Sequence, residues 1–217
     1  MSDLIEIATK YFGNIAQGAV VTLQLTAGAL ILSTALGLVI AGLRLSGRWW
    51  LRAPAVVYIE VIRNTPALLQ LFLIYFGLAE LGLRLDAFPA AILTLGILGG
   101  AFLAEIFRGG ILSVDRGQAE AALSLGMRYD QMMRRIVLPQ AFRVVIPPST
   151  NYLISLLKET SLVLTIAVPE IMYRANNVAS ATYQSLAVFA IAGAIYFALC
   201  FPLSRLAIAL ERKLRIA

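Results

Sequence analysis

The side chains that could bind a solute or do chemistry lie inside strongly apolar stretches of this sequence. One stretch contains four consecutive polar residues, Lys158, Glu159, Thr160 and Ser161. An ionisable side chain at the centre of a bilayer costs about 2.5–3.5 kcal/mol on insertion scales, so it faces a protein partner or a water-filled cavity. Four consecutive residues cover nearly the whole circumference of a helix and cannot all point into one apolar seam. We therefore expect at least one of the four to meet a polar pathway.

A second polar group, Asn64-Thr65-Pro66, interrupts another apolar stretch. The proline removes a backbone hydrogen bond and bends a helix, which leaves a carbonyl free for whatever lies in the centre. A packing kink, which is common in membrane helices, is an equal alternative. Asn64 is accordingly a further candidate for the pathway.

Two pairs of opposite charges are spaced three residues apart within apolar stretches. They are Glu60 with Arg63, and Glu105 with Arg108. Residues at this spacing share a helix face, so each pair can neutralise itself or the other pair. We expect structural ion pairing for these four residues rather than contact with a solute, because Arg108 also lies near the end of its stretch.

Catalytic chemistry finds little support in the sequence. Ser155 and Lys158 stand three residues apart and imitate a Ser-Lys dyad, which leaves an intramembrane hydrolase as a remote alternative. Histidine is absent, which removes the commonest general base and metal ligand, and no phosphate-binding loop of the form G-x-x-x-x-G-K-[ST] occurs. The sequence predicts no catalytic residue, no metal site and no cofactor in this chain. If ATP drives its function, the ATPase is another subunit.

The elements that must position these side chains are membrane-spanning helices. Of the 217 residues, 60% are hydrophobic and 14% are charged, whereas soluble domains average about 45–50% and about 25%. A hydrocarbon core needs about 20 apolar residues. We expect one all-α polytopic membrane domain over 1–217 with five spans, over about 18–43, 54–78, 89–111, 146–168 and 186–210.

The third span carries small residues that allow another helix to approach closely. They are Gly96, Gly99, Gly100, Gly109 and Gly110. No internal repeat is apparent, although an ion-coupled secondary transporter, the other alternative, usually shows repeats with broken helices in matched positions.

The distribution of charge predicts which ends of the spans face the cytoplasm. Three arginines follow the first span, six arginines against three acids lie over 108–143, from the end of the third span to the start of the fourth, and the tail from Arg205 is basic. By the positive-inside rule these ends are cytoplasmic, which places the N-terminus outside and the C-terminus inside. The net charge of +6 therefore reflects sidedness rather than nucleic-acid binding.

The N-terminus lacks the basic and apolar regions of a cleaved signal peptide. We expect it to be retained as a short amphipathic helix. The residues predicted to share its apolar face are Leu4, Ile5, Ala8 and Phe12.

The polar segment 112–145, between the third and fourth spans, is predicted to contain two short helices. Asp115 can cap the first helix, and Gly126 can end it in a left-handed turn. Its expected common face consists of Ala119, Ala122 and Leu123. A helix face of small alanine side chains that ends at a glycine turn allows close docking into a groove of another protein.

The second short helix is predicted from about Tyr129 to Val137. Its apolar stripe consists of Met132, Met133, Ile136 and Val137. We expect Leu138-Pro139 to stop it and Pro147-Pro148 to start the fourth span, because proline is tolerated at the first turn of a helix and disrupts its interior.

Three groups of residues in this chain resemble one known family. The spacing of Glu120, Ala121, Ala122, Gly126, Ile136, Leu138 and Pro139 resembles the EAA signature of ABC importer permeases. The resemblance continues through PQAFRVVIPP (139–148), Asn151 and KETSL (158–162), and upstream through YIEVIRNTPALLQ (58–70) and AEIFRGGI (104–111). The outer pieces are similar to the polar amino acid branch of that family, and together the matches cover most of 58–170.

The resemblance implies a type I ABC importer permease fold and a transport subunit without enzymatic activity. It implies that the segment 112–145 is a cytoplasmic coupling loop, docked on a dimer of ABC ATPase subunits that binds the ATP and Mg²⁺. Nucleotide binding would then rock the spans between inward-open and outward-open states. The other implied partners are a second permease, identical or related, and an extracytoplasmic amino acid-binding protein, in a bacterial inner membrane. Which amino acid is carried stays open.

Overall fold

A computed structural model describes residues 2–214, with side chains from Thr9 onward, and every regular element within that range is helical. Two helices, α1 (Ser2–Leu45) and α2 (Trp49–Arg63), precede a broken segment of α3 (Ala67–Phe72), the π-helix η1 (Leu73–Gly77) and α4 (Leu78–Glu80). The long helix α5 (Ala87–Leu112) leads into α6 (Arg116–Ser124), α7 (Tyr129–Met132) and the π-helix η2 (Met133–Val137). The chain then forms α8 (Leu138–Glu159), the 3-10 helix η3 (Thr160–Ile166), α9 (Ile171–Thr182) and α10 (Ser185–Leu214).

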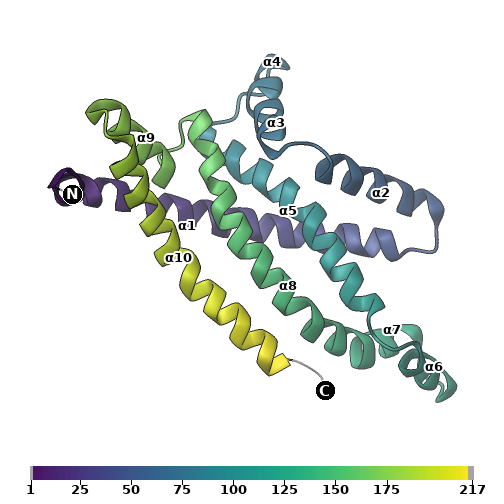
Figure 1. The fold of residues 1–217 in the computed structure, drawn as a ribbon. Coiled ribbons are helices and arrows are strands. Elements are labelled where there is room, and N and C mark those ends of the chain that lie inside the picture. Colours follow the sequence, from purple (N-terminus) through teal and green to yellow (C-terminus); the bar gives the residue numbers. More distant parts are fainter. Residues whose placement is uncertain (1, 215–217) are drawn as a thin grey trace.

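Three of the described helices are long and apolar enough to cross a membrane unaided, namely α1, α5 and α10. Two bent pairs bring the number to as many as five. One pair is α2 with the segment 67–80, bent by 107°, and the other is the segment 129–166 with α9, bent by 49°. The N-terminus and α9 lie at one end of the molecule, whereas α6, α7 and the end of α10 lie at the other (Figure 1).

The core is built around the contact of α1 with α5, which brings small residues together. A side chain at Gly96, Gly99 or Gly100 would collide with Leu32, Ser33 or Leu36 of α1. Ser33 Oγ also donates a hydrogen bond to the Gly96 carbonyl over 3.2 Å. The predicted close-packing surface of α5 is therefore confirmed at these glycines, and Val145 of α8 would similarly clash with a side chain at Gly110. Gly109, by contrast, is exposed, and a Cβ atom placed there would have nothing within 4 Å.

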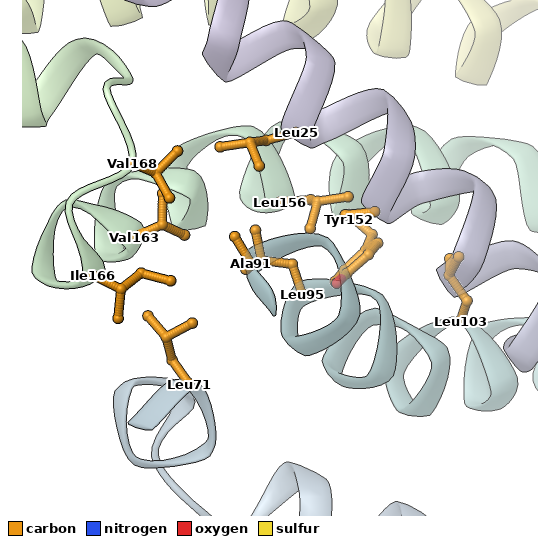
Figure 2. Close-up of a cluster of buried hydrophobic side chains, with 11 residues drawn as sticks. Leu25, Leu71, Ala91, Leu95, Leu103, Tyr152, Leu156, Val163, Ile166 and Val168 are labelled. Atoms are coloured by element: carbon orange, nitrogen blue, oxygen red, sulfur yellow. The ribbon is translucent and has the colours of Figure 1, made fainter. Parts of the chain in front are cut away.

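The same core extends to the broken segments. Leu71 of α3 and Ile166 of η3 point toward each other, and Leu95 of α5 lies between Leu71 and Leu156 of α8 (Figure 2). These side chains are at most 4% exposed. Packing against α5 thus holds both bent segments in place.

The first two predicted spans differ from the observed helices. The expected short N-terminal helix is continuous with the first span in α1, because no proline separates them and the glycines at 13 and 18 are accommodated within the helix. Phe12 is 53% exposed, and the side chains of Leu4, Ile5 and Ala8 lie outside the described residues. The break at Asn64-Thr65-Pro66 is present, and it turns the chain far more sharply than a kink does.

The prolines of α8 do not have the predicted roles. Pro139 does not stop the second short helix, and Pro147 and Pro148 lie inside α8 rather than at its start. The backbone passes from α7 through the π-turn η2 directly into α8, so Pro139, which lacks a backbone N–H, lies just after the π-turn without ending the helix. Further along, proline is tolerated in membrane helices because neighbouring groups satisfy the freed backbone carbonyls.

Candidate coupling and solute-path sites

The polar insert between α5 and α8 is a small folded unit with defined helix ends. Asp115 Oδ1 accepts a hydrogen bond from the Gly117 amide over 2.7 Å, which confirms the predicted cap of α6. At the other end Gly126 has φ +78°, and its amide donates to the Leu123 carbonyl. The Met127 amide donates to the Ala122 carbonyl, which completes a Schellman motif. The predicted left-handed turn at Gly126 is therefore present.

Ala122 lies in the interior of this insert. It is 2% exposed and packs in a cluster with Met132 and Val137, which are 3% and 5% exposed. Partly buried residues surround them, among them Ile111 of α5 and Ile136 of η2. This cluster fixes α6 against η2, so Ala122 and Ile136 of the EAA pattern shape the insert from within.

The outer surface of the insert differs from the alanine face that periodicity predicts. Ala122 is buried and Ala119 is partly buried, whereas Leu123 is 48% exposed, so the three do not form one docking face. Glu120 and Ala121 are exposed, together with two large side chains at the turn, Leu125 at 84% and Tyr129 at 68%.

Sequence reasoning missed Leu125 and Tyr129 as candidate coupling residues. Their positions one residue before and three residues after the turn-forming Gly126 are the signal that could have identified them. A tight turn leaves little buried space for flanking side chains.

The insert joins α8 without interruption. Leu138 is 43% exposed and Pro139 is exposed, and both belong to the first turn of α8. The insert is therefore joined to α8 through η2 without an intervening loop.

Glu105 forms a three-residue charge cluster at the insert end of α5. Arg108 Nη2 lies 2.6 Å from Glu105 Oε2, and Arg108 Nε donates to both carboxylate oxygens over 3.1 Å. Arg44 of α1 adds a longer contact, with Nε 3.6 Å from Glu105 Oε1. Arg44 was not predicted as a partner, because sequence spacing reveals pairs within one helix and not pairs between helices.

Glu60 and Arg63 do not form the ion pair that their spacing permits. Among the described residues, Glu60 Oε2 accepts instead from Asn64 Nδ2 over 3.0 Å. The Arg63 guanidinium lies 5.4 Å from the centre of the Phe102 ring, within range of a cation–π contact. Glu60, Arg63 and Asn64 are all exposed on the surface of this single chain.

The residues at 158–161 surround the change from α8 to the 3-10 helix η3. A hollow of about 380 Å³ is lined by Ser155, Lys158, Glu159, Ser161 and Leu162. Lys158 is exposed, whereas Glu159 is partly buried and its Oε2 has no hydrogen-bond partner among the described residues. Thr160 points elsewhere: it is fully buried, and its Oγ1 donates to the Leu157 carbonyl over 2.7 Å.

The candidate groups do not converge on one site within this chain. No hydrogen bond or ion pair between side chains of residues 9–214 joins the hollow at Glu159 to Asn64 or to Glu60. Ser155 and Lys158 share the hollow, yet no hydrogen bond links them in that range, so the dyad imitated by their spacing is not assembled.

A buried carboxylate, Glu170, lies at the start of α9. Glu170 is fully buried and accepts from the amides of Met172 and Tyr173 over 2.9 and 2.7 Å, which caps α9. Tyr196 Oη of α10 donates to it over 2.7 Å. Sequence spacing does not reveal the contact with Tyr196, which is 26 positions away.

The chain matches the family described as the binding-protein-dependent transport system inner membrane component over residues 33–216. It belongs to this family and is a membrane-spanning permease subunit of an ABC importer, in which ATP is hydrolysed on separate subunits. The expected fold and class are thereby confirmed.

Individual relatives cover nearly the whole chain. The arginine transport system permease protein ArtQ of Bacillus subtilis (strain 168) is 39% identical over 202 residues, which are 93% of this chain and 92% of ArtQ. The probable amino-acid ABC transporter permease protein PatM of Vibrio harveyi is 37% identical over 100% of this chain and 96% of its own length.

Solved structures agree with this assignment. A chain from the crystal structure of an amino acid ABC transporter with histidines has a TM-score of 0.90 at 39% identity, covering 94% of this chain and 96% of that one. An inward-facing structure of the MetNI methionine ABC transporter has a TM-score of 0.73 at 19% identity, over 92% and 97% of the two chains, and supports the fold alone.

Proposed function

We propose that this permease imports a polar amino acid across a bacterial inner membrane by alternating access. Its partners would be a dimer of ABC ATPases that binds ATP and Mg²⁺, a second permease chain, and an extracytoplasmic amino acid-binding protein. The naming of ArtQ and PatM as arginine and amino-acid transport proteins supports the substrate class.

The observation that carries the solute path is the exposure of polar side chains within apolar helical segments. Lys158, Glu60 and Asn64 are exposed on the isolated chain, and Glu159 and Ser161 line a hollow beside Lys158. In a membrane such groups are costly against lipid. A path that runs between two permease chains, and is completed by both, relieves this cost and accounts for the absence of one convergent site.

The coupling surface is proposed to be the outer face of the insert. Glu120, Ala121, Leu125 and Tyr129 surround the turn at Gly126 and would contact a groove of the ATPase. In this arrangement Ala122 and Ile136 hold the insert together, and Leu138 and Pro139 connect it to α8. Glu105 and Arg108 have a structural role, at the end of α5 from which the insert departs.

Uptake by the assembled transporter tests the solute path. The chain would be co-expressed with its ATPase and binding protein, reconstituted in vesicles, and assayed with a competition panel of radiolabelled amino acids. We expect Glu159→Gln to change the KM or the maximal rate of uptake by at least fivefold. Glu80→Gln, an exposed carboxylate outside the hollow, serves as its control.

Thr160→Val tests whether the Thr160 hydroxyl contacts the solute or only stabilises the fold. The matched control is Thr165→Val. The Oγ1 of Thr165 donates to the Leu162 carbonyl over 2.8 Å within the same 3-10 helix, but Thr165 is exposed. Unchanged kinetics in both Glu159→Gln and Thr160→Val would show that the junction of α8 and η3 does not contact the solute.

Orientation is tested by accessibility labelling. Cys200 is the only native cysteine, so Cys200→Ser provides a background for single reporters. In intact cells we expect Arg128→Cys to resist an impermeant maleimide until the membrane is opened, and Tyr183→Cys, which replaces a 92% exposed residue beyond α9, to react at once. Immediate reaction at position 128 would contradict the cytoplasmic placement of the insert.

A further inference from the structure

A second, apolar hollow lies on the other side of α8 from the polar residues discussed above. Its volume is about 570 Å³, within the range of roughly 300–1,000 Å³ typical of small-molecule sites. Three helices form its walls: α1 contributes Leu30, Thr34 and Leu38, α5 contributes Leu103, Phe107 and Ile111, and α8 lines it from Leu138 to Leu153.

The hollow has a buried floor and an exposed rim. Leu103 and Ala141 on the floor are 1% and 3% exposed, whereas Leu38 and Phe142 on the rim are 59% and 65% exposed. The hydroxyls of Thr34 and Thr150 donate to the carbonyls of Leu30 and Ile146 in their own helices. Among the described residues, only the Ser149 Oγ in this lining is buried without a hydrogen-bond partner, and the other lining side chains are apolar. The hollow therefore suits an apolar occupant that enters from the surface of the helices.

The dimensions of the hollow suit a single hydrocarbon chain. From Leu138 to Leu153 the lining of α8 rises roughly 22 Å at about 1.5 Å per residue. A volume of about 570 Å³ spread along that length matches a long, thin occupant such as one hydrocarbon chain. Half of a hydrocarbon core is about 15 Å deep, so the hollow accommodates the acyl chain of one leaflet.

Positive charge lies at the end of the hollow nearest the insert. Arg143 is exposed beside the rim residue Phe142, and Arg134 and Arg135 are exposed in η2, directly before Leu138. None of the three forms an ion pair within residues 9–214. Arginine side chains near a membrane surface can bind the phosphate of an anionic headgroup.

We propose that this hollow is a binding site for an anionic phospholipid of the leaflet on the side of the insert. One acyl chain lies between α1, α5 and α8, and the phosphate meets Arg143. Ile111 lines the hollow and also packs against the cluster of Ala122, Met132 and Val137. A bound acyl chain would therefore contact Ile111, against which the insert packs.

Photo-crosslinking tests the site in the complete transporter reconstituted in vesicles. The probes are phosphatidylglycerol and phosphatidylcholine carrying the same diazirine-labelled acyl chain. We expect phosphatidylglycerol to label peptides that contain Phe107, Ile111 and Phe142, at least threefold more strongly than phosphatidylcholine. Arg143→Gln should remove that preference.

Filling the hollow provides the decisive comparison. Ser149→Phe and Thr34→Phe place a ring in it from opposite walls, and we expect each to reduce labelling at least fivefold. Ala35→Phe is the matched control, since Ala35 is exposed on α1 and does not line the hollow. Size-exclusion chromatography with the ATPase identifies any variant that fails to assemble.

Two results would overturn the proposal. Equal labelling in the two filling variants and in Ala35→Phe would show that the chain does not occupy the hollow. Equal labelling by the two lipids would refute the role of Arg143 and the anionic headgroup. The assay measures lipid contact directly, so its outcome does not depend on which solute the permease carries.

Discussion

A substitution at Gly126 tests the coupling surface, because its effect on the folding of the insert can be separated from its effect on binding to the ATPase. The residue has φ +78°, and a Cβ atom placed there would have nothing within 4 Å. A side chain at this position is therefore disfavoured only by the left-handed backbone conformation. Adopting that conformation costs about 1–2 kcal/mol for most residues and less for Asp and Asn, which adopt it more readily. We therefore expect Gly126→Asp to leave the insert folded and the membrane helices intact.

The docking cost of Gly126→Asp is larger than its folding cost. Leu125, which is 84% exposed, and Tyr129, which is 68% exposed, surround the turn and would be covered by the ATPase. An uncompensated carboxylate buried in such an interface costs about 3–5 kcal/mol. At about 1.4 kcal/mol per tenfold change, even 3 kcal/mol weakens the complex by roughly 100-fold.

The assay measures binding and coupling in parallel. Purified permease in detergent is titrated with the ATPase, and vesicles containing the complete transporter are assayed for solute-stimulated ATP hydrolysis. Gly126→Asn is the control, because Asn matches Asp in shape and in tolerance of the left-handed conformation but carries no charge. We expect Gly126→Asn to retain most of the affinity and Gly126→Asp to lose stimulation.

Two outcomes would refute this reasoning. Normal stimulation in Gly126→Asp vesicles would mean that the turn does not enter the interface. Equal defects in the Asp and Asn variants would place the effect in the backbone rather than in the docking surface.

Three further predictions concern stability. In a thermal unfolding assay of the purified protein in detergent, Arg108→Gln should lower the stability by about 1.5–3 kcal/mol, since it removes charge-assisted hydrogen bonds to Glu105. Arg44→Gln loses only a 3.6 Å contact and should lower the stability by under about 1 kcal/mol in the same assay. Ala122→Leu overpacks the insert at a cost of about 1–3 kcal/mol and should speed tryptic cleavage at Arg128 severalfold, while Ser124→Leu on the exposed side leaves it unchanged. Glu170→Gln should lower the free energy of unfolding more than Tyr196→Phe, because Glu170 accepts three hydrogen bonds and Tyr196 supplies one of them; equal losses would contradict this order.

The sequence carried strong signals wherever a single local rule decides the structure. Asp115 caps α6 and Gly126 ends it, as their side-chain chemistry requires. The apolar runs likewise locate α5 and α10, because each run is long enough to define a helix by itself. The proline rule misled at Pro139 and Pro147, since it describes an isolated helix and not one that continues from a π-turn and packs along α5 and α10.

The charged residues show why sequence spacing alone cannot predict which ion pairs form. Glu105 with Arg108 and Glu60 with Arg63 have the same spacing, yet only the first pair forms. The neighbours of the second pair account for the difference. The Arg63 guanidinium lies over the ring of Phe102 of α5, and Glu60 accepts a hydrogen bond from Asn64 on the next helical turn. Spacing permits a pair, and the tertiary neighbours decide whether it forms.

The distribution of polar groups also bears on how the transport path must be assembled. Glu170 and Thr160 are fully buried and satisfied by hydrogen bonds, so they serve the fold of one chain. Lys158 and Glu60 are exposed in segments whose surroundings are apolar. A chain that could close its own path would bury both groups, as it buries Glu170. We therefore propose that a second permease supplies the missing wall, and we expect the solute affinity of the isolated chain to be lower than that of the assembled transporter.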